Sequence, residues 1–372
     1  MNLRTAPTIR VGVLGFGRMG AIHAEAVVAS PAARLVAVCD TSVAARDRAA
    51  RLHRVPVFDD LAHFLGQSLD AVIIASNTQY HARHIAACAD AGVAIFTEKP
   101  VGLTSEESDR VLAAVERARV PFQIGYQRRW DAGYLEMKRL IDAGEIGRPV
   151  YLKSYGRDPD ASSPANWGFE KNGGLFVNCA IHDYDLARFL FGQEIQTVSA
   201  TGAVAVYHGL AEVGDIDTCS TTLALSGGAI AVTEWTRFAS YGYDVAAEVI
   251  GTDGALQLGG ARAEGLAIRR RSEAAGSVLG RFGQAFRSSI DEFAAAVREE
   301  RLPSPGVHDA RTALQVALAA RESYMKGSVT VQVPLLKAIS PDSRGADSQA
   351  GKCPLPPSDD VYVTARPGSP PR

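Results

Sequence analysis

Apolar residues in the first third of the chain form short continuous runs, and amphipathic, helix-like stretches separate these runs. The apolar runs predict strands at 9–15, 34–40, 70–76, 93–99 and 122–127. Because the runs are apolar at every position, we expect strands that helices cover on both faces. The alternation of strand and helix predicts an α/β fold with a parallel, doubly wound Rossmann sheet over residues 1–127.

The pattern changes after residue 127. A helix at 133–147 and a strand at 149–158 precede a polar loop at 158–172 and a further helix. Strand-like runs with "SGG" and "TDG" turn signals follow at 195–206, 218–228, 229–239, 243–251 and 254–260. With closing helices near 284–300 and 308–326, these runs predict an α+β domain over 128–337 with a large, mostly antiparallel open sheet. Residues 338–372 are rich in Pro, Ser, Gly and Asp, which predicts a disordered tail.

Composition excludes several classes of protein. The 372 residues carry a net charge of −2, and no run of Lys or Arg suggests a nucleic-acid partner. Five scattered cysteines without a CxxC pair argue for reduced thiols and against a metal cluster. No run reaches ~18 apolar residues, and the first ten residues lack an apolar signal core. We therefore expect a soluble, cytoplasmic protein without a membrane or metal site.

The stretch "GFGRMG" places Gly15, Gly17 and Gly20 in G-x-G-x-x-G spacing, where the first strand ends and a helix begins. In that context the glycines allow a tight turn and bring the backbone close to a pyrophosphate, while the helix offers free N–H groups to the anion. The alternative is a glycine-rich turn that binds nothing. We expect residues 15–20, which also include Phe16, Arg18 and Met19, to bind a dinucleotide.

Asp40 ends the second strand, twenty residues after Gly20. A carboxylate there can accept hydrogen bonds from ribose hydroxyls but would repel a 2′-phosphate, and "TSV" next to it offers no arginine. The position therefore predicts NAD rather than NADP, although Asp40 could instead cap the following helix.

Two further positions have candidate chemistry. Lys99, in "TEKP", ends a buried strand at the sheet edge where ligands gather, and Pro100 restricts its backbone to extended geometry. His182 lies in "NCAIHDYD" on a predicted helix, where Asn178, His182 and Asp185 share one face. Asp183 points elsewhere, and we expect it to pair with an arginine. A histidine with pKa ~6.5 suits a base near neutral pH.

Together, "GFGRMGAIHA", "ASNTQYHARH", "FTEKP", "GYQRRWDAGY" and "GGLFVNCAIHDYD" resemble the glucose-fructose oxidoreductase/inositol dehydrogenase (Gfo/Idh/MocA) family over residues 8–335. "QRRWDAGY" and "YGYD" are most similar to its inositol 2-dehydrogenase branch. The resemblance implies hydride transfer between a sugar or cyclitol carbon and NAD, in a homo-oligomer (a dimer or tetramer) that assembles through the C-terminal sheet.

The resemblance also implies roles for single residues. Lys99 would contact the reacting hydroxyl, and His182 would act as general acid/base. Cofactor contacts would include Ser76, Asn77, His81 and Glu98. Substrate contacts would come from Arg128, Arg157 and Asp158, and Tyr241 would either close the pocket or pack as a sheet aromatic. Inositol dehydrogenases can carry histidine at the position of Gly156 and asparagine at that of Asp158, which leaves the identity of the polyol open.

Asn178 departs from the family motif, which has aspartate there. An asparagine can orient His182 but cannot supply charge. Three interpretations follow: another carboxylate, Asp158 or Asp185, compensates; the substrate supplies a group that Asn178 binds; or activity is lost. The sequence thus predicts an NAD-dependent cyclitol or sugar dehydrogenase. The alternatives are a relative that holds NAD tightly for redox-assisted hydrolysis or elimination, and a non-catalytic NAD or sugar sensor.

Overall fold

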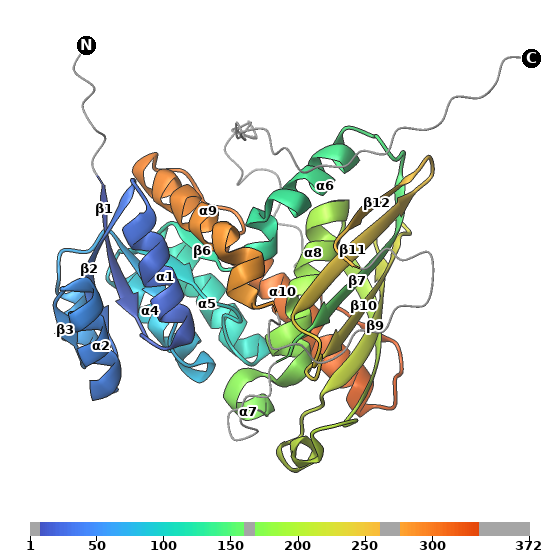
Figure 1. The fold of residues 1–372 in the computed structure, drawn as a ribbon, viewed down its shortest axis with the longest axis horizontal. Coiled ribbons are helices and arrows are strands. Elements are labelled where there is room, and N and C mark those ends of the chain that lie inside the picture. The colour runs from blue at the N-terminus through green and yellow to red at the C-terminus, as the bar shows by residue number, and fades with distance from the viewer. Residues whose placement is uncertain (1–7, 160–167, 261–275, 335–372) are drawn as a thin grey trace, which may run out of the picture. The chain divides into compact units, whose positions relative to one another are not determined.

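The first third of the chain forms a parallel sheet, as its continuous apolar runs predict (Figure 1). The computed structural model describes residues 8–159, 168–260 and 276–334, which belong to one compact unit. Among these residues, the sheet has six strands in the order β3-β2-β1-β4-β5-β6. They are β1 (Ile9–Leu14), β2 (Ala33–Cys39), β3 (Val57–Phe58), β4 (Ala71–Ile74), β5 (Ala94–Thr97) and β6 (Phe122–Ile124). The order reverses between β1 and β4, which creates a crevice at their carboxyl ends.

Helices connect these strands, and side chains at their first turns explain where several of them begin. Ser42 caps α2, and Thr104 caps α5 by accepting a hydrogen bond from the backbone N–H of Glu107. The helices are α1 (Arg18–Ala29), α2 (Val43–His53), α3 (Leu61–Leu65), α4 (His81–Asp90) and α5 (Ser105–Ala118), with a short 3₁₀ turn η1 (Thr78–Tyr80). The short elements β3 and α3 were not predicted, because neither forms a sustained apolar run.

The second sheet is mixed but mostly antiparallel. Its strands are β7 (Pro149–Arg157), β8 (Ile195–Ala203), β9 (Thr218–Leu225), β10 (Ile230–Thr236), β11 (Asp244–Gly251), β12 (Ala255–Leu258) and β13 (Val331–Gln332). They lie in the order β12-β11-β7-β10-β9-β8-β13, and β7 and β10 pair in parallel. The fold class predicted from the sequence is confirmed. The predicted disordered tail lies outside the described residues.

Helices that follow the last Rossmann strand pack on one face of this sheet and on the Rossmann helices (Figure 1). Helix α10 contacts both β8 and α5, and α9 contacts α1. The elements are η2 (Gln127–Trp130), α6 (Ala132–Asp142), α7 (Phe169–Asn172), η4 (Phe176–Ala180), α8 (Ile181–Phe191), η5 (His208–Val213), α9 (Val278–Arg298) and α10 (Val307–Met325). The two sheets are therefore joined through packed helices.

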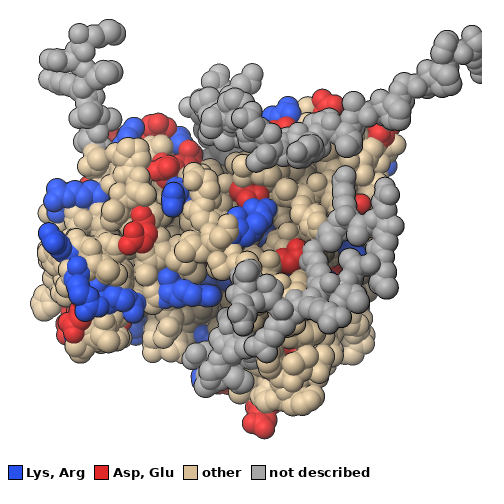
Figure 2. Space-filling model, viewed as in Figure 1, with Lys and Arg blue, Asp and Glu red and all other residues tan. Residues whose placement is uncertain are grey.

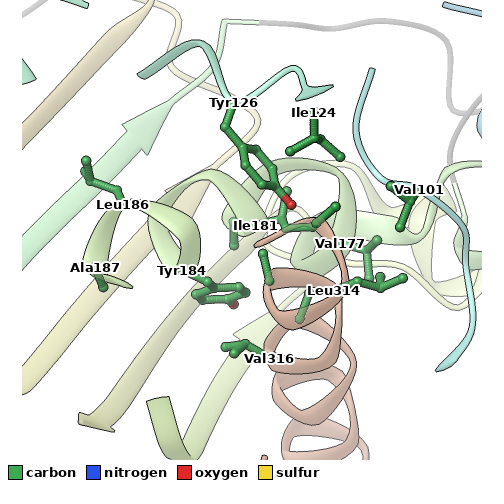
Figure 3. Packing of buried hydrophobic residues seen from close by; sticks show 14 of the residues in the cluster. Val101, Ile124, Tyr126, Val177, Ile181, Tyr184, Leu186, Ala187, Leu314 and Val316 are labelled. Carbon is green, nitrogen blue, oxygen red and sulfur yellow. The ribbon is translucent and has the colours of Figure 1, made fainter. Parts of the chain in front are cut away.

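A continuous apolar core crosses the junction of the two sheets (Figure 3). Val101, in the loop between β5 and α5, lies in the same cluster as Val177 of η4 and Leu314 of α10. Burial of apolar surface stabilises a fold by ~25 cal/mol per Å². The shared core therefore holds the loop after β5 against η4. This packing positions Lys99 beside Asn178.

Basic and acidic side chains are interspersed over the face of the molecule shown in Figure 2. In the described part of the chain, no helix is long and apolar enough to cross a bilayer. The same residues contain no cluster of three His, Cys, Asp or Glu side chains that could hold a metal ion.

A buried ion-pair network joins α8 to η2 and α10. Arg129 donates to both carboxylate oxygens of Asp185, at 2.9 and 2.6 Å, and to Asp309 at 3.0 Å. Arg188 also donates to Asp309. Burial raises the pKa of Asp185, and the charge of Arg129 opposes that rise. Asp185 therefore serves as a structural partner of Arg129. Contrary to the prediction from helix spacing, Asp185 does not face the site with His182, since only His182 lines the cavity described below.

We expect Asp185→Ala to lower the free energy of unfolding by ~3–5 kcal/mol, because it leaves the buried Arg129 with a single remaining carboxylate. Urea-unfolding midpoints provide the measurement. The matched control is Asp142→Ala, which removes an exposed pair with Lys138 and should cost less than ~1 kcal/mol. Equal losses in the two variants would contradict the structural role of Asp185.

Candidate active site

A cavity of about 630 Å³ lies where the carboxyl ends of β4 and β5 meet η4, α8 and the inner face of the second sheet. Nine of the residues singled out from the sequence line it: Arg18, Met19, Ser76, His81, Glu98, Lys99, Asp158, Asn178 and His182. Side chains not predicted from the sequence complete its polar and aromatic wall: Gln127, Asn172, Cys179, Trp235, Arg237 and Tyr243. The loops after two Rossmann strands and the second domain thus build one site.

The glycine loop beside this cavity fits a bound pyrophosphate. Gly15 has a φ of +92°, and a Cβ there would lie 2.5 Å from the backbone nitrogen of Ser76. A Cβ on Gly20 would lie 1.9 Å from the carbonyl oxygen of Gly15. At Gly17, the N-cap of α1, a Cβ would meet nothing within 4 Å, and no side chain caps the helix. No side chain therefore caps the first N–H groups of α1, which leaves them available to a dinucleotide phosphate.

Asp40 holds the glycine loop in place. Its carboxylate accepts hydrogen bonds from the N–H of Phe16 at 2.6 Å and from the N–H of Ser42 at 2.8 Å. The N-cap residue of α2 is Ser42, so the alternative of Asp40 as the helix cap does not apply. Arg46, which the sequence pattern did not bring forward, donates to the carbonyls of Asp40 and Thr41. Asp40 thus lies at the tip of β2 beside the glycine loop.

Two histidines organise the loop that follows β4. His84 contacts the hydroxyl of Ser76 at 2.8 Å, and burial, with the charges of Arg83 and His81, lowers the pKa of His84 to about 4. The ring of His81 contacts the carbonyl of Ser76 at 2.8 Å and that of Pro100 at 2.7 Å. His81 therefore ties the loop after β4 to the loop after β5. Asn77 begins η1 but does not line the cavity.

Glu98 lines the cavity with a buried histidine behind it. His23 of α1 contacts one carboxylate oxygen of Glu98 at 2.7 Å and packs edge-on against Phe96 and Phe286. Burial alone would raise the pKa of Glu98, but the hydrogen bond and charge of His23, followed by the charge of Lys99, bring it below its ordinary value. Glu98 is thus an oriented carboxylate. Sequence reasoning missed His23, although "GRMGAIHA" places it one helical turn past Gly20.

Asn178 contacts Lys99. The ammonium of Lys99 donates to the main-chain oxygen of Asn178 at 2.5 Å and to its side-chain oxygen at 3.0 Å. Burial lowers the pKa of Lys99, and the nearby Cys179 and Glu98 act in the opposite direction. Across the described residues, no hydrogen bond joins Asn178 to His182. The reason is local: residues 176–180 form a π-helical turn, which changes the i, i+4 alignment that the sequence predicts.

His182 stands at the start of α8, almost fully buried in the cavity wall. Its Nδ1 has no hydrogen-bond partner among the described residues, and its ring packs edge-on against Tyr126. Burial, with the positive charges of Lys99 and Arg128, holds the pKa of His182 well below 6.5. The imidazole is therefore neutral at pH 7 and can accept a proton.

The four residues expected at the substrate occupy different places. Asp158 lines the cavity. Arg128 is buried below the wall, where it donates to Asp183 at 2.6 Å, so the expected arginine partner of Asp183 is Arg128 itself. Arg157 pairs with Glu234 on the opposite face of the second sheet, because side chains alternate along β7. Tyr241 is half-buried outside the cavity wall.

Strand alternation could have identified two of the residues that the sequence reading missed. In β10, Ala231, Thr233 and Trp235 alternate toward the buried face, and Arg237 continues that face just beyond the strand. Asp215 accepts a hydrogen bond from Arg237 at 2.7 Å and holds its guanidinium in the cavity wall. Tyr243, another wall residue that was not predicted, lies two positions after the predicted Tyr241 and packs edge-on against Phe282.

Both parts of the chain match models of known protein families. Residues 9–126 match the model of an oxidoreductase family with an NAD-binding Rossmann fold, and residues 134–257 match the GFO/IDH/MocA C-terminal domain. The chain is 36% identical to scyllo-inositol 2-dehydrogenase (NAD(+)) of Bacillus subtilis, over 89% of this chain and 98% of that protein. It is 35% identical to inositol 2-dehydrogenase of Rhizobium meliloti, over 85% and 97%.

A solved structure is similar over the same region. The scyllo-inositol dehydrogenase of Lactobacillus casei, with bound NAD(H) and scyllo-inositol, superposes with a TM-score of 0.80 at 31% identity. The match covers 88% of this chain and 99% of that one. The likeness therefore extends over both sheets.

Burial of neutral His182 should make the protein less stable in mild acid. Its pKa is lower in the folded than in the unfolded state, where it is ~6.5, so the unfolded chain binds more protons below pH 6.5. Below pH 6.5 the free energy of unfolding of the wild type falls as the pH is lowered. We expect this fall to be smaller in His182→Gln, by up to ~1.4 kcal/mol per pH unit. Urea midpoints at pH 7 and pH 5 measure this. His63→Gln, at an exposed site on α3, is the control. An identical decline in His182→Gln and wild type would rule out the depressed pKa.

Proposed function

Because the chain belongs to the Gfo/Idh/MocA family of oxidoreductases with an NAD-binding Rossmann fold, we propose that it is an NAD-dependent dehydrogenase of a cyclitol or a related sugar. The observation that carries the proposal is the convergence of Lys99 and His182 on one polar cavity beside the glycine loop. The inositol dehydrogenases among its relatives support the substrate class.

Oxidation of a secondary alcohol removes a hydride from the carbon and a proton from the hydroxyl, and Lys99 and His182 both act on the hydroxyl. NAD, when bound, accepts the carbon-bound hydrogen as hydride. The hydroxyl proton passes to His182, which burial keeps in its neutral form and therefore free to accept a proton. The ammonium of Lys99 holds the hydroxyl oxygen and stabilises the negative charge that develops on it. Asn178 fixes the position of that ammonium.

The remaining roles follow from the positions of the groups. Residues 15–20 would hold the pyrophosphate, and Asp40 would hold the ribose farther from the cavity. Ser76, His81 and Glu98 would contact the nicotinamide half, with Asn77 at the margin of that loop. For the substrate we propose contacts from Asp158, Gln127 and Tyr243, which line the cavity. Arg128, Arg157 and Tyr241 do not line it, and we propose no substrate contact for them.

We also propose a division of the chain into a cofactor domain at 1–127 and a substrate domain at 128–337, with a separate tail at 338–372. Assembly into a cytoplasmic homo-oligomer would use the face of the second sheet that α8 and α10 leave open. Size-exclusion chromatography with light scattering tests the assembly.

Lys99→Met should lower the kcat for NADH formation by at least about a hundredfold, because no cation then stabilises the alkoxide. The assay is NAD⁺ reduction over a panel of inositol isomers, hexoses and anhydrosugars. Lys326→Met, at an exposed lysine paired with Glu322, is the control. Undiminished turnover by Lys99→Met would overturn the proposed role. Copurified NAD without net NADH would favour redox-assisted hydrolysis or elimination, and polyol binding without turnover would favour a sensor.

Asn178→Asp should shift the alkaline limb of the kcat/KM profile to higher pH. A carboxylate next to the ammonium favours its charged form, so the pKa of Lys99 rises and the lysine stays protonated over a wider range. The pH–rate profile of each variant is the measurement. Asn172→Asp is the control, because Asn172 lines the same cavity and its side-chain oxygen accepts from the backbone N–H of Gly174. A shift confined to the acidic limb would instead assign Asn178 to His182.

A further inference from the structure

The carboxylate of Glu98 is held in place at the end of β5. The ring Nε2 of His23, in α1, lies 2.7 Å from its Oε1, and the backbone N–H of Lys99 donates to its Oε2 at 3.3 Å. Gly125, which follows β6, leaves room for the group, since a Cβ there would lie 3.4 Å from Oε1. Glu98 is 7% exposed and lines the cavity, and His23 is fully buried. The carboxylate therefore has a fixed position in the cavity wall.

His23 acts on the cavity only through Glu98. It does not line the cavity, and its Nδ1 has no hydrogen-bond partner among the described residues. An ionised carboxylate can only accept, so the ring carries a proton on Nε2 where it meets Glu98. Burial by itself would raise the pKa of Glu98, but the hydrogen bond and charge of His23 bring it below its ordinary value. His23 thus keeps a buried carboxyl ionised where a ligand can meet it.

The order of the strands places Glu98 on the nicotinamide side of the site. Asp40 ends β2, the glycine loop follows β1, and Glu98 follows β5, on the other side of β1 from Asp40. A dinucleotide with its pyrophosphate on the glycine loop and one ribose at Asp40 extends its other half over the ends of β4 and β5. Hydride transfer then requires the nicotinamide ring to lie beside a substrate held by Lys99, the residue next to Glu98.

The charge of Glu98 distinguishes the two forms of the cofactor. The oxidised nicotinamide ring carries a positive charge, and the reduced ring carries none. The ammonium of Lys99 therefore opposes binding of the oxidised ring, and an ionised Glu98 favours it. Hydrogen bonds from ribose hydroxyls to the carboxylate are available to both forms and do not separate them. Among the described residues that line the cavity, the cations are Arg18, Lys99 and Arg237 and the carboxylates are Glu98 and Asp158.

We infer that the ionised carboxylate of Glu98 favours NAD⁺ relative to NADH in this site, and that His23 is the positioning residue that holds this charge. The inference rests on the proposed function and deepens it. In a dehydrogenase that oxidises alcohols, such a charge strengthens binding of the oxidised cofactor beside the ammonium of Lys99. The same charge gives the reduced cofactor no such advantage, which favours its release after each turnover.

The ratio of two dissociation constants isolates this charge. Titration calorimetry gives the Kd of NADH and the Kd of NAD⁺ for each variant, and the first is divided by the second. Glu98→Gln keeps the shape of the side chain and removes its charge, so the ratio should fall about tenfold at neutral pH. The same substitution in the Lys99→Met background should give a similar fall. Its absence there would assign the effect to the lysine and overturn the role of the carboxylate charge.

His23→Leu tests the positioning role through its pH dependence. Without the donor, burial raises the pKa of Glu98, so the carboxyl is neutral at low pH and ionises as the pH increases. The ratio should therefore match that of Glu98→Gln near about pH 6 and approach the wild-type value by about pH 9. Lys99 and His81 are the other titratable groups that act on Glu98, and both are kept in this variant.

Two further variants serve as controls. His23→Gln retains a side-chain N–H that can donate to Glu98, and it should keep the wild-type ratio. His308→Leu removes the histidine from an exposed pair with Glu116, in which the two side chains lie 3.2 Å apart. It should leave the ratio unchanged at every pH, because neither residue of that pair lines the cavity.

The outcomes separate this inference from the function on which it rests. An unchanged ratio in Glu98→Gln would overturn it. If Glu98→Gln does not fold, His23→Leu decides, since a wild-type ratio at every pH in that variant would also overturn it. NADH formation is measured separately, and its absence with every polyol would overturn the proposed dehydrogenase while the ratio still decides the roles of Glu98 and His23. A wild type that binds neither nucleotide would overturn both.

Discussion

The site depends on one charged hydrogen bond that spans the two parts of the molecule. Lys99 leaves the carboxyl end of a Rossmann strand, and its ammonium donates twice to Asn178 in the π-helical turn before α8. Apolar contacts in the shared core, with Val101 on one side and Val177 on the other, hold the two segments at that distance. A buried cation bound to neutral oxygens keeps a lowered pKa and retains capacity to interact with an incoming hydroxyl.

The acidic residues near the Lys99–Asn178 hydrogen bond are already bound to other side chains, so His182 is the group that remains to act as the base. Asp183 and Asp185 of "HDYD" are both committed to buried arginines, Arg128 and Arg129. Glu98 is held by His23. Without a carboxylate partner and beside two cations, His182 stays neutral, which is the form a proton acceptor needs. Asn178 therefore acts on Lys99, to which it is hydrogen-bonded, and not on His182.

The sequence predicted the features that depend on neighbouring residues, and it did not predict those that depend on contacts between distant parts of the chain. The glycine fingerprint, Asp40 and Lys99 could be placed because glycine spacing and strand ends follow from short-range rules. The partner of Asn178 could not, because a π turn has no reliable sequence signature and changes which residues share a face. The position of Arg157 could have been predicted, since alternation along β7 puts it opposite Asp158. Arg128 shows a different limit: its role depends on a buried partner, Asp183, that lies 55 positions away.

The proposed function requires the cavity beside Lys99 and Asn178 to support direct transfer of hydride from an alcohol carbon to NAD. The most direct test uses a cyclitol deuterated at its ring carbons, incubated with the enzyme and NAD⁺, followed by mass spectrometry and NMR of the recovered nucleotide. We expect one deuterium at C4 of the nicotinamide for each ketone formed. Deuterium that appears in the solvent, or product formed without labelled NADH, would contradict it.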